Sequence, residues 1–410
     1  MTMTDRIDAV IREQHEIVDG TVFANGAVFA SPWGPYKAHW LRDGLYTLEA
    51  YKHHGIHKRL LQLLNAPMNI FHRYSPKIRA GVRQKPHFEH EFIHSRYDAY
   101  TLREIPGPWG HCQFDTLGLF LYELADLVLK FPSLLHSLDI GYSEATIVVN
   151  NVTRYLNTVK WWEYPDYGCW EEGPDLHSSS LGAVIGGLQK LEELNTRSES
   201  GELYFELEQL KKGKHALKKL LPRETDNPDH GPNRHRGCDM AQLGLIWPFD
   251  VLDDAQTDTV LGRIEEKLVR ERGVIRYAHD PYYNAADDRL QRGQLESGEE
   301  AVFYREEDAA HLRAVHEGSE AEWPLGFAWL SIVHSHLAGK RSGDPAKEHQ
   351  AKARDYWERL LATAVAFDGT VSGHIPELYS GGIPNLNTPL TWTAAFTMIA
   401  SVRLASLGER

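Results

Sequence analysis

The sequence predicts an all-α protein in which six helical hairpins close into one toroid. Three observations lead to this prediction: a chain of 410 residues, about twelve stretches with helical spacing, and short connections that alternate with long ones. Because a typical domain has about 100–200 residues, the chain requires either several domains or one large repetitive architecture. Two separate helical domains are the alternative, but no Gly/Ser linker or change of composition marks a boundary. We therefore expect residues 1–410 to form one unit.

The helical stretches are identified by the spacing of their apolar residues. Leu117, Phe120, Leu121, Leu124 and Val128 fall on one face of a helix, and similar stripes recur along the chain. Strand-like alternation is scarce. In chain order, the stretches predicted to be helical are 2–18, 40–53, 57–73, 117–128, 143–160, 179–195, 203–220, 238–252, 257–271, 321–338, 346–366 and 390–406.

Three connections between these helices are long, namely 74–112, 161–178 and 272–320, and they are rich in Trp, Tyr, His, Pro and charged residues. Long loops in a compact fold are usually functional or disordered. Disordered segments contain few aromatic residues, so these loops are expected to be ordered. We expect them to gather at one end of the toroid and to carry the functional site.

The composition restricts the class of protein. Hydrophobic residues make up 42% of the chain and charged residues 25%, and 44 basic against 57 acidic residues leave a net charge of −13. Such an acidic chain is a poor match for a phosphate backbone, and no apolar run is long enough to cross a bilayer. Residues 1–18 lack the apolar region of a signal peptide, and three widely spaced cysteines fit a reducing compartment. We expect a cytoplasmic protein without nucleic-acid or membrane partners.

Two adjacent carboxylates follow an aromatic residue in the second long connection. Glu171 and Glu172 come directly after Trp170, shortly before a predicted helix. Like charge and burial beside an indole raise the pKa of a carboxyl, as a general acid requires. Taken alone, the pair is more simply explained as solvated residues at a helix start.

Further charged residues accompany aromatic ones elsewhere. Glu377 lies in a Gly/Pro-rich turn before Trp392, and Arg42 and Asp43 follow Trp40. Each has a plain structural explanation as a loop residue or a surface ion pair. Several such pairs in the loops of one toroid indicate a sugar pocket, because aromatic faces stack on a pyranose and charged groups bind its hydroxyls.

The segment from His90 to His94 matches the H-E-x-x-H pattern of zinc proteases. In those enzymes the pattern lies on a regular helix with a third ligand downstream. Here it lies in a segment with Pro86 that is predicted to be a loop, so we expect no metal site. No glycine-rich phosphate loop or nucleophile elbow is present, and we expect no cofactor.

Five segments of the chain resemble those of glucoamylase-type enzymes, glycoside hydrolase family 15, in the same order. They extend over nearly the whole chain, from about residue 33 to about residue 395. The segments are YKAHWLRD at 36–43, WGHCQFD at 109–115, GCWEE at 168–172, RYAHDPY at 276–282, and Glu377 followed by PLTW at 389–392.

The resemblance implies an (α/α)6 barrel and an inverting hydrolase that removes glucose from the non-reducing end of α-glucosides. It implies that Glu171 is the general acid and Glu377 the general base, with water as the nucleophile. In an inverting enzyme the two carboxyls stand about 6.5–9.5 Å apart, with room for that water. Because no starch-binding module accompanies the barrel, short soluble α-1,4 or α-1,6 oligosaccharides are the expected substrates. The implied sugar-binding residues are Tyr36, Trp40, Arg42, Asp43, Trp109, Trp170, Glu172, Arg276, Tyr282 and Trp392.

A second resemblance leads to a different function. The segments HSRY at 94–97, WGH at 109–111, EWPL at 322–325 and PELY at 376–379 are similar to the phosphorylase kinase α subunit, whose domain is regulatory. A non-catalytic glucan-binding domain is therefore the alternative, and a trehalase-like or unsaturated-glycoside hydrolase is a third. Glu172 favours the enzyme, because the kinase segments place Arg there. Leu378 and Tyr379 follow the base where well-known family members have Gln and an aromatic residue, so the residue that orients the base is left open.

Overall fold

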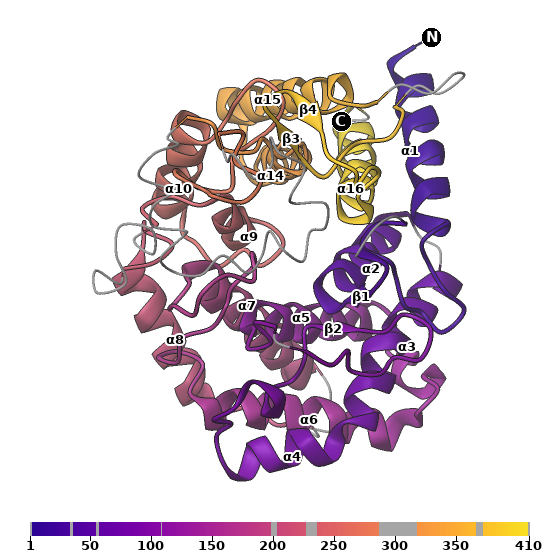
Figure 1. The fold of residues 1–410 in the computed structure, drawn as a ribbon, viewed down its shortest axis with the longest axis vertical. Coiled ribbons are helices and arrows are strands. Elements are labelled where there is room, and N and C mark those ends of the chain that lie inside the picture. The colour runs from indigo at the N-terminus through magenta and orange to yellow at the C-terminus, as the bar shows by residue number, and fades with distance from the viewer. Residues whose placement is uncertain are drawn as a thin grey trace.

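The computed structural model describes residues 2–32, 36–54, 57–107, 109–197, 203–226, 236–286, 318–365 and 372–408. Within these residues the regular secondary structure is helical, apart from two short antiparallel strand pairs (Figure 1). The strands are β1 (His39–Trp40) with β2 (Arg96–Tyr97) and β3 (Tyr379–Ser380) with β4 (Ile383–Pro384). The α-helices are α1 (Met3–Asp19), α2 (Leu41–His54), α3 (His57–Arg73), α4 (Ser75–Arg83), α5 (Phe114–Lys130), α6 (Gly141–Val159), α7 (Ser178–Arg197), α8 (Leu207–Leu220), α9 (Leu243–Ile246), α10 (Asp254–Lys267), α14 (Leu325–Lys340), α15 (Gly343–Ala362) and α16 (Thr391–Gly408).

Six helices form a closed inner ring. In spatial order α2 contacts α5, α5 contacts α7, α7 contacts α9, α9 contacts α14, α14 contacts α16, and α16 returns to α2. The outer helices pack on this ring: α1 on α16, α3 on α2, α8 on α7, α10 on α9 and α15 on α14, while α6 contacts both α3 and α5. The termini therefore lie close together (Figure 1). The predicted (α/α)6 barrel is confirmed.

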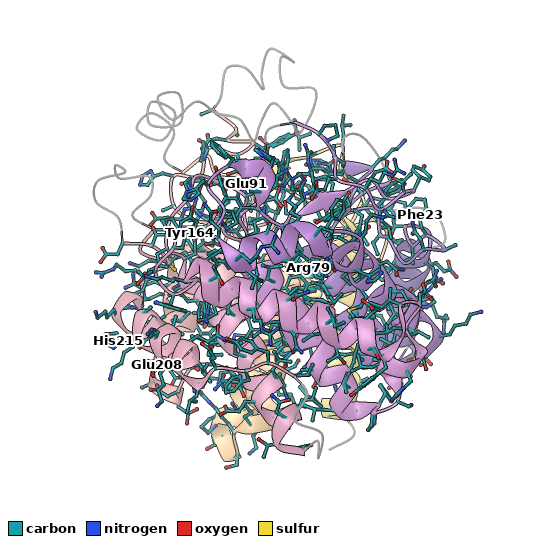
Figure 2. The ribbon with its side chains drawn as sticks, turned by 90° about the horizontal axis from the view of Figure 1, so that it is seen from below. Phe23, Arg79, Glu91, Tyr164, Glu208 and His215 are labelled. Carbon is teal, nitrogen blue, oxygen red and sulfur yellow. The ribbon has the colours of Figure 1, made fainter. Side chains whose placement is uncertain are left out.

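The two rings differ in burial because of their surroundings. Inner helix α14 has twelve of its sixteen residues buried, since it faces other helices on nearly all sides. Outer helices have one polar face, and Arg79 of α4 and Glu208 and His215 of α8 are exposed on the outside of the barrel (Figure 2).

Two predictions of local structure were wrong. The connection 74–112 contains helix α4, which begins with Ser75-Pro76, because proline is favoured in the first turn of a helix. The predicted helix 238–252 is reduced to one turn of 3-10 helix, Met240–Gln242, and the short α9. It ends because Pro248 disfavours helical geometry at the residue before it. Most of the third long connection, residues 287–317, lies outside the described residues.

Glycine lets the inner helices α5 and α7 approach each other closely. A Cβ on Gly118 of α5 would lie 2.4 Å from the backbone nitrogen of Val184 in α7, so no side chain fits there. We expect Gly118→Ala to lower the free energy of unfolding by about 2–3 kcal/mol, because one helix backbone must move away from the other. Urea denaturation measures this. Gly262 of α10 has no neighbour within 4 Å of such a Cβ, and Gly262→Ala should stabilise by about 0.5–1 kcal/mol. Equal effects of the two substitutions would contradict the close packing of α5 and α7.

No described helix is both long and apolar enough to cross a membrane. The three cysteines Cys112, Cys169 and Cys238 are buried and unpaired.

Candidate functional site

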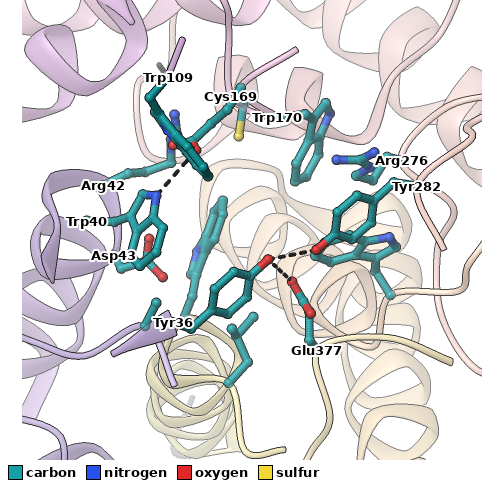
Figure 3. Close-up of a pocket in the computed structure, with 15 residues that line it drawn as sticks. Tyr36, Trp40, Arg42, Asp43, Trp109, Cys169, Trp170, Arg276, Tyr282 and Glu377 are labelled. Carbon is teal, nitrogen blue, oxygen red and sulfur yellow. Dashed lines mark hydrogen bonds and ion pairs between the residues drawn. The ribbon is translucent and has the colours of Figure 1, made fainter. Parts of the chain in front are cut away.

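One pocket of about 600 Å³ lies at the end of the barrel where the inner helices begin (Figure 3). The inner helices α2, α5, α7, α14 and α16 contribute through their first turns or through the segments before them, so the long connections do meet at one end. The lining residues are Ala30, Tyr36, Trp40, Arg42, Asp43, Trp109, Cys169, Trp170, Glu171, Arg276, Tyr282, Trp323, Glu377, Leu390 and Trp392.

Glu171 stands in a tight turn before α7. Its backbone is left-handed, with φ of +60°, and its N–H donates to the carbonyl of Gly168. This conformation is unfavourable for a residue with a side chain, and such residues concentrate at functional sites. The indole N–H groups of Trp109 and Trp40 donate to Oε2 of Glu171 over 2.8 Å and 3.3 Å. Oε1 lies 3.6 Å from Nη1 of Arg42 and accepts no hydrogen bond from the described residues, so it can exchange a proton with a ligand.

Glu377 has a different environment, although it lines the same pocket. It is 2% exposed. The hydroxyl of Tyr36 donates to Oε1 over 2.9 Å and also lies 2.7 Å from the hydroxyl of Tyr282. The side-chain amides of Asn385 and Asn387 donate to Oε2 over 2.5 Å and 2.8 Å. Burial raises the pKa of Glu377, and these donors oppose the rise because they favour the ionised carboxylate.

The structure shows what orients Glu377 without a glutamine after it. Leu378 is completely buried in the core. The hydroxyl of Tyr379 donates to the carbonyl of Thr363, and its backbone pairs with Glu322. Both residues thus anchor the loop, and the carboxylate itself is oriented by other side chains.

Arg42 and Asp43 form a charged part of the pocket wall in the first turn of α2. Nε of Arg42 donates to Asp115 over 2.7 Å and Nη2 donates to Gln113 over 2.6 Å, so only Nη1 is directed towards Glu171. Asp43 is 6% exposed, and burial raises its pKa to about 7. The adjacent guanidinium opposes this rise only in part. A buried carboxylate without a tight ion pair can accept hydrogen bonds from ligand hydroxyls.

Arg276 is held by two carboxylates. Its Nε and Nη2 donate to the two oxygens of Asp280 over 2.6 Å and 2.7 Å, and Nη2 also donates to Glu172 over 2.6 Å. The other oxygen of Glu172 accepts from Arg236 and from the hydroxyl of Tyr277. Glu172 is therefore occupied by protein donors behind the wall, where it positions Arg276.

Aromatic rings form the remaining wall. Trp323 lies between Trp170 and Tyr282, with ring centroids 5.7 Å and 5.8 Å away. Trp392 stacks on Tyr46 with ring centroids 5.0 Å apart, which fixes the Trp392 ring in the lining of the pocket. Such a combination of aromatic faces and buried charged groups suits a sugar, which has both apolar C–H faces and hydroxyls.

The structure brings eleven of the twelve predicted site residues into this one lining, and Glu172 lies directly behind it. Sequence reasoning missed Trp323, whose only signal was its place in the EWPL segment, and Cys169, whose only signal was its place in the GCWEE segment. It also missed the donors Asn385 and Asn387, because no motif connects them with a glutamate eight and ten positions earlier.

The H-E-x-x-H segment does not form a helix suited to zinc. Glu91 ends a one-turn 3-10 helix, Glu89–Glu91, and the ring of His94 stacks on that of His111 with centroids 3.6 Å apart. Among the described residues no three His, Cys, Asp or Glu side chains are arranged to hold a metal ion.

Comparison with known proteins confirms both resemblances. The sequence model of glycosyl hydrolases family 15 matches residues 9–204. A probable phosphorylase b kinase regulatory subunit alpha from Drosophila melanogaster is 25% identical over 74% of this chain and 24% of its own. The liver isoform from Takifugu rubripes is 23% identical over 92% of this chain and 30% of its own. The chain thus spans less than a third of the length of each of these relatives.

Solved structures agree on the fold. A wild-type glycosidase has a TM-score of 0.70 at 18% identity and covers 98% of both chains. The glucoamylase of Saccharomycopsis fibuligera has a TM-score of 0.67 at 13% identity, over 98% of this chain and 96% of its own. A variant of the same kind of glycosidase, with a TM-score of 0.71 at 18% identity over 98% of both chains, was solved in complex with glucose. At these identities the likeness establishes the shared barrel.

Proposed function

We propose that this chain is an inverting glycoside hydrolase that releases β-glucose from the non-reducing end of short α-1,4- or α-1,6-linked glucosides. The observation that carries the proposal is the convergence of Glu171 and Glu377, distant in sequence, on one aromatic pocket with different hydrogen-bond partners. An inverting hydrolase needs two carboxyl groups with different roles. The proposal treats residues 1–410 as one catalytic unit that acts in the cytoplasm.

In this mechanism Glu377 takes a proton from a water molecule, whose oxygen attacks the anomeric carbon. The bond from that carbon to the leaving oxygen breaks, and Glu171 protonates the leaving oxygen. Glu377 has then gained one proton and Glu171 has lost one, so the two carboxyls have exchanged protonation states. β-Glucose and the second product leave the pocket. Proton exchange with solvent then protonates Glu171 again and deprotonates Glu377. Arg42, Asp43 and Arg276 bind the hydroxyls of the terminal glucose.

Incubation with maltose, maltotriose and isomaltose tests the proposal, with products followed by proton NMR from the first minutes. We expect the β-anomer of glucose to appear first and the α-anomer to follow by mutarotation. A preparation of the Glu171→Gln/Glu377→Gln double variant excludes a contaminating hydrolase. Initial α-glucose would contradict the inverting mechanism.

A non-catalytic glucan-binding domain is the second candidate, because the curated relatives are named regulatory subunits. The same pocket would then hold a glucan end without cleaving it. Absence of turnover on all three sugars, together with calorimetric binding of maltotriose that Trp392→Ala abolishes, would establish this second function.

A further inference from the structure

The two oxygens of the Glu377 carboxylate have unequal surroundings. Oε2 accepts two amide N–H groups, from Asn385 and Asn387. Oε1 accepts one hydrogen bond, from the hydroxyl of Tyr36. Since a carboxylate oxygen has about two acceptor positions, Oε2 is saturated and Oε1 retains one position for a ligand.

The loop that carries the two amides is shaped by its backbone. The N–H of Glu377 donates to the carbonyl of Asn387 over 3.1 Å. The N–H of Asn385 donates to the carbonyl of Leu378, also over 3.1 Å. Between the two asparagines, Leu386 points outward and is 83% exposed. Because backbone hydrogen bonds hold the loop in place, its conformation does not depend on the two asparagine side chains. Leu386 offers a control position in the same loop.

Besides the two asparagines, Tyr36 is the described residue with a direct hydrogen bond to Glu377, and it donates to Oε1. Of the charged and titratable groups that influence Glu377, Arg276 favours its ionised form. The other titratable groups that interact electrostatically with Glu377 donate no hydrogen bond to Oε2. They are Asp43, Tyr36, Tyr282 and Tyr283. The asymmetry consequently comes from the asparagine pair.

We infer that Asn385 and Asn387 are positioning residues that occupy Oε2 of Glu377 and so reserve Oε1 for the proton of the attacking water. The inference rests on the proposed function for its catalytic part. The arrangement of donors itself is independent of catalysis, because neutral N–H donors stabilise a carboxylate over a carboxylic acid in any buried site.

A titration that does not need turnover tests the arrangement. In protein labelled with 13C at the glutamate carboxyl, the Glu377 signal is assigned by its loss in Glu377→Gln, and its pKa is followed by NMR. We expect Asn385→Ala and Asn387→Ala each to raise this pKa by about 0.5–1 pH unit, the equivalent of one hydrogen bond. Asn387→Asp should raise it further, because it places a like charge beside Oε2. Leu386→Ala should leave it unchanged.

The acid limb of the pH profile of kcat/KM tests the catalytic part with the same variants. We expect the midpoint of this acid limb to move to higher pH by the same amount as the Glu377 pKa in the titration. We also expect kcat to be reduced and KM to stay within about threefold of wild type. An unchanged Glu377 pKa in the Asn385→Ala/Asn387→Ala double variant would overturn the inference. If the Glu377 pKa shifts in these variants but the wild-type protein hydrolyses no α-glucoside, the role of the two asparagines as donors would be supported and the proposed hydrolase function would be contradicted.

Discussion

Replacing either carboxyl of the pocket with its amide is expected to reduce the rate by about two to four orders of magnitude. Glu171→Gln removes the proton that the leaving oxygen needs, and Glu377→Gln removes the group that accepts a proton from water. Both substitutions keep the size of the side chain. In Glu377→Gln the carbonyl oxygen can still accept from Asn385 and Asn387, so the loop should stay in place.

The two roles are separated by the choice of substrate. α-Glucosyl fluoride has a leaving group that needs little protonation, so Glu171→Gln should retain most of its rate on this substrate, whereas Glu377→Gln should stay slow. Initial rates on maltose and on the fluoride measure both effects. Glu208→Gln, at an exposed position of α8, is the control and should keep the wild-type rate. The same loss on both substrates in Glu171→Gln would contradict its assignment as the acid.

Asp43→Asn is expected to stabilise the protein while it inactivates it. Burial raises the pKa of Asp43 to about 7, from an ordinary value of 3.8. Because the folded state binds this proton more tightly than the unfolded state, the stability contributed by Asp43 decreases as pH rises from about 4 to about 7. Above pH 7 the folded protein carries a buried charge that Asn lacks. The variant should then be more stable by about 2–4 kcal/mol, and the difference should vanish below pH 4.

Chemical denaturation of both proteins at pH 4, 6 and 8 measures this dependence, and hydrolysis of maltose measures the activity. We expect kcat/KM to fall by about 100-fold or more, since a hydrogen bond from a sugar hydroxyl to a charged acceptor is lost. Asp8→Asn, at an exposed position of α1, is the control and should change neither quantity with pH. A pH-independent difference in stability would show that Asp43 does not become charged in the folded state.

Most of the fold could be predicted because helical periodicity is a local property. The stripe from Leu117 to Val128 is part of α5, and the predicted helix 57–73 has the bounds of α3. The errors arose where a local rule overrode that periodicity: Pro76 begins a helix within a polar stretch, and Pro248 ends one within an apolar stretch. The closed ring of α2, α5, α7, α9, α14 and α16 was predicted only as a toroid from the number of helices and their loops.

By itself, the sequence determined the all-α class, the acidic charge and eleven of the fifteen residues that line the pocket. Each of these follows from composition, from periodicity or from a short motif. Only the tertiary structure decided how those residues are used. Glu172 accepts a hydrogen bond from Arg276 outside the pocket lining, and Asn385 and Asn387 donate to one oxygen of Glu377. The physical reason is that hydrogen bonds between distant segments depend on where the barrel brings their atoms, and no spacing along the chain encodes that distance.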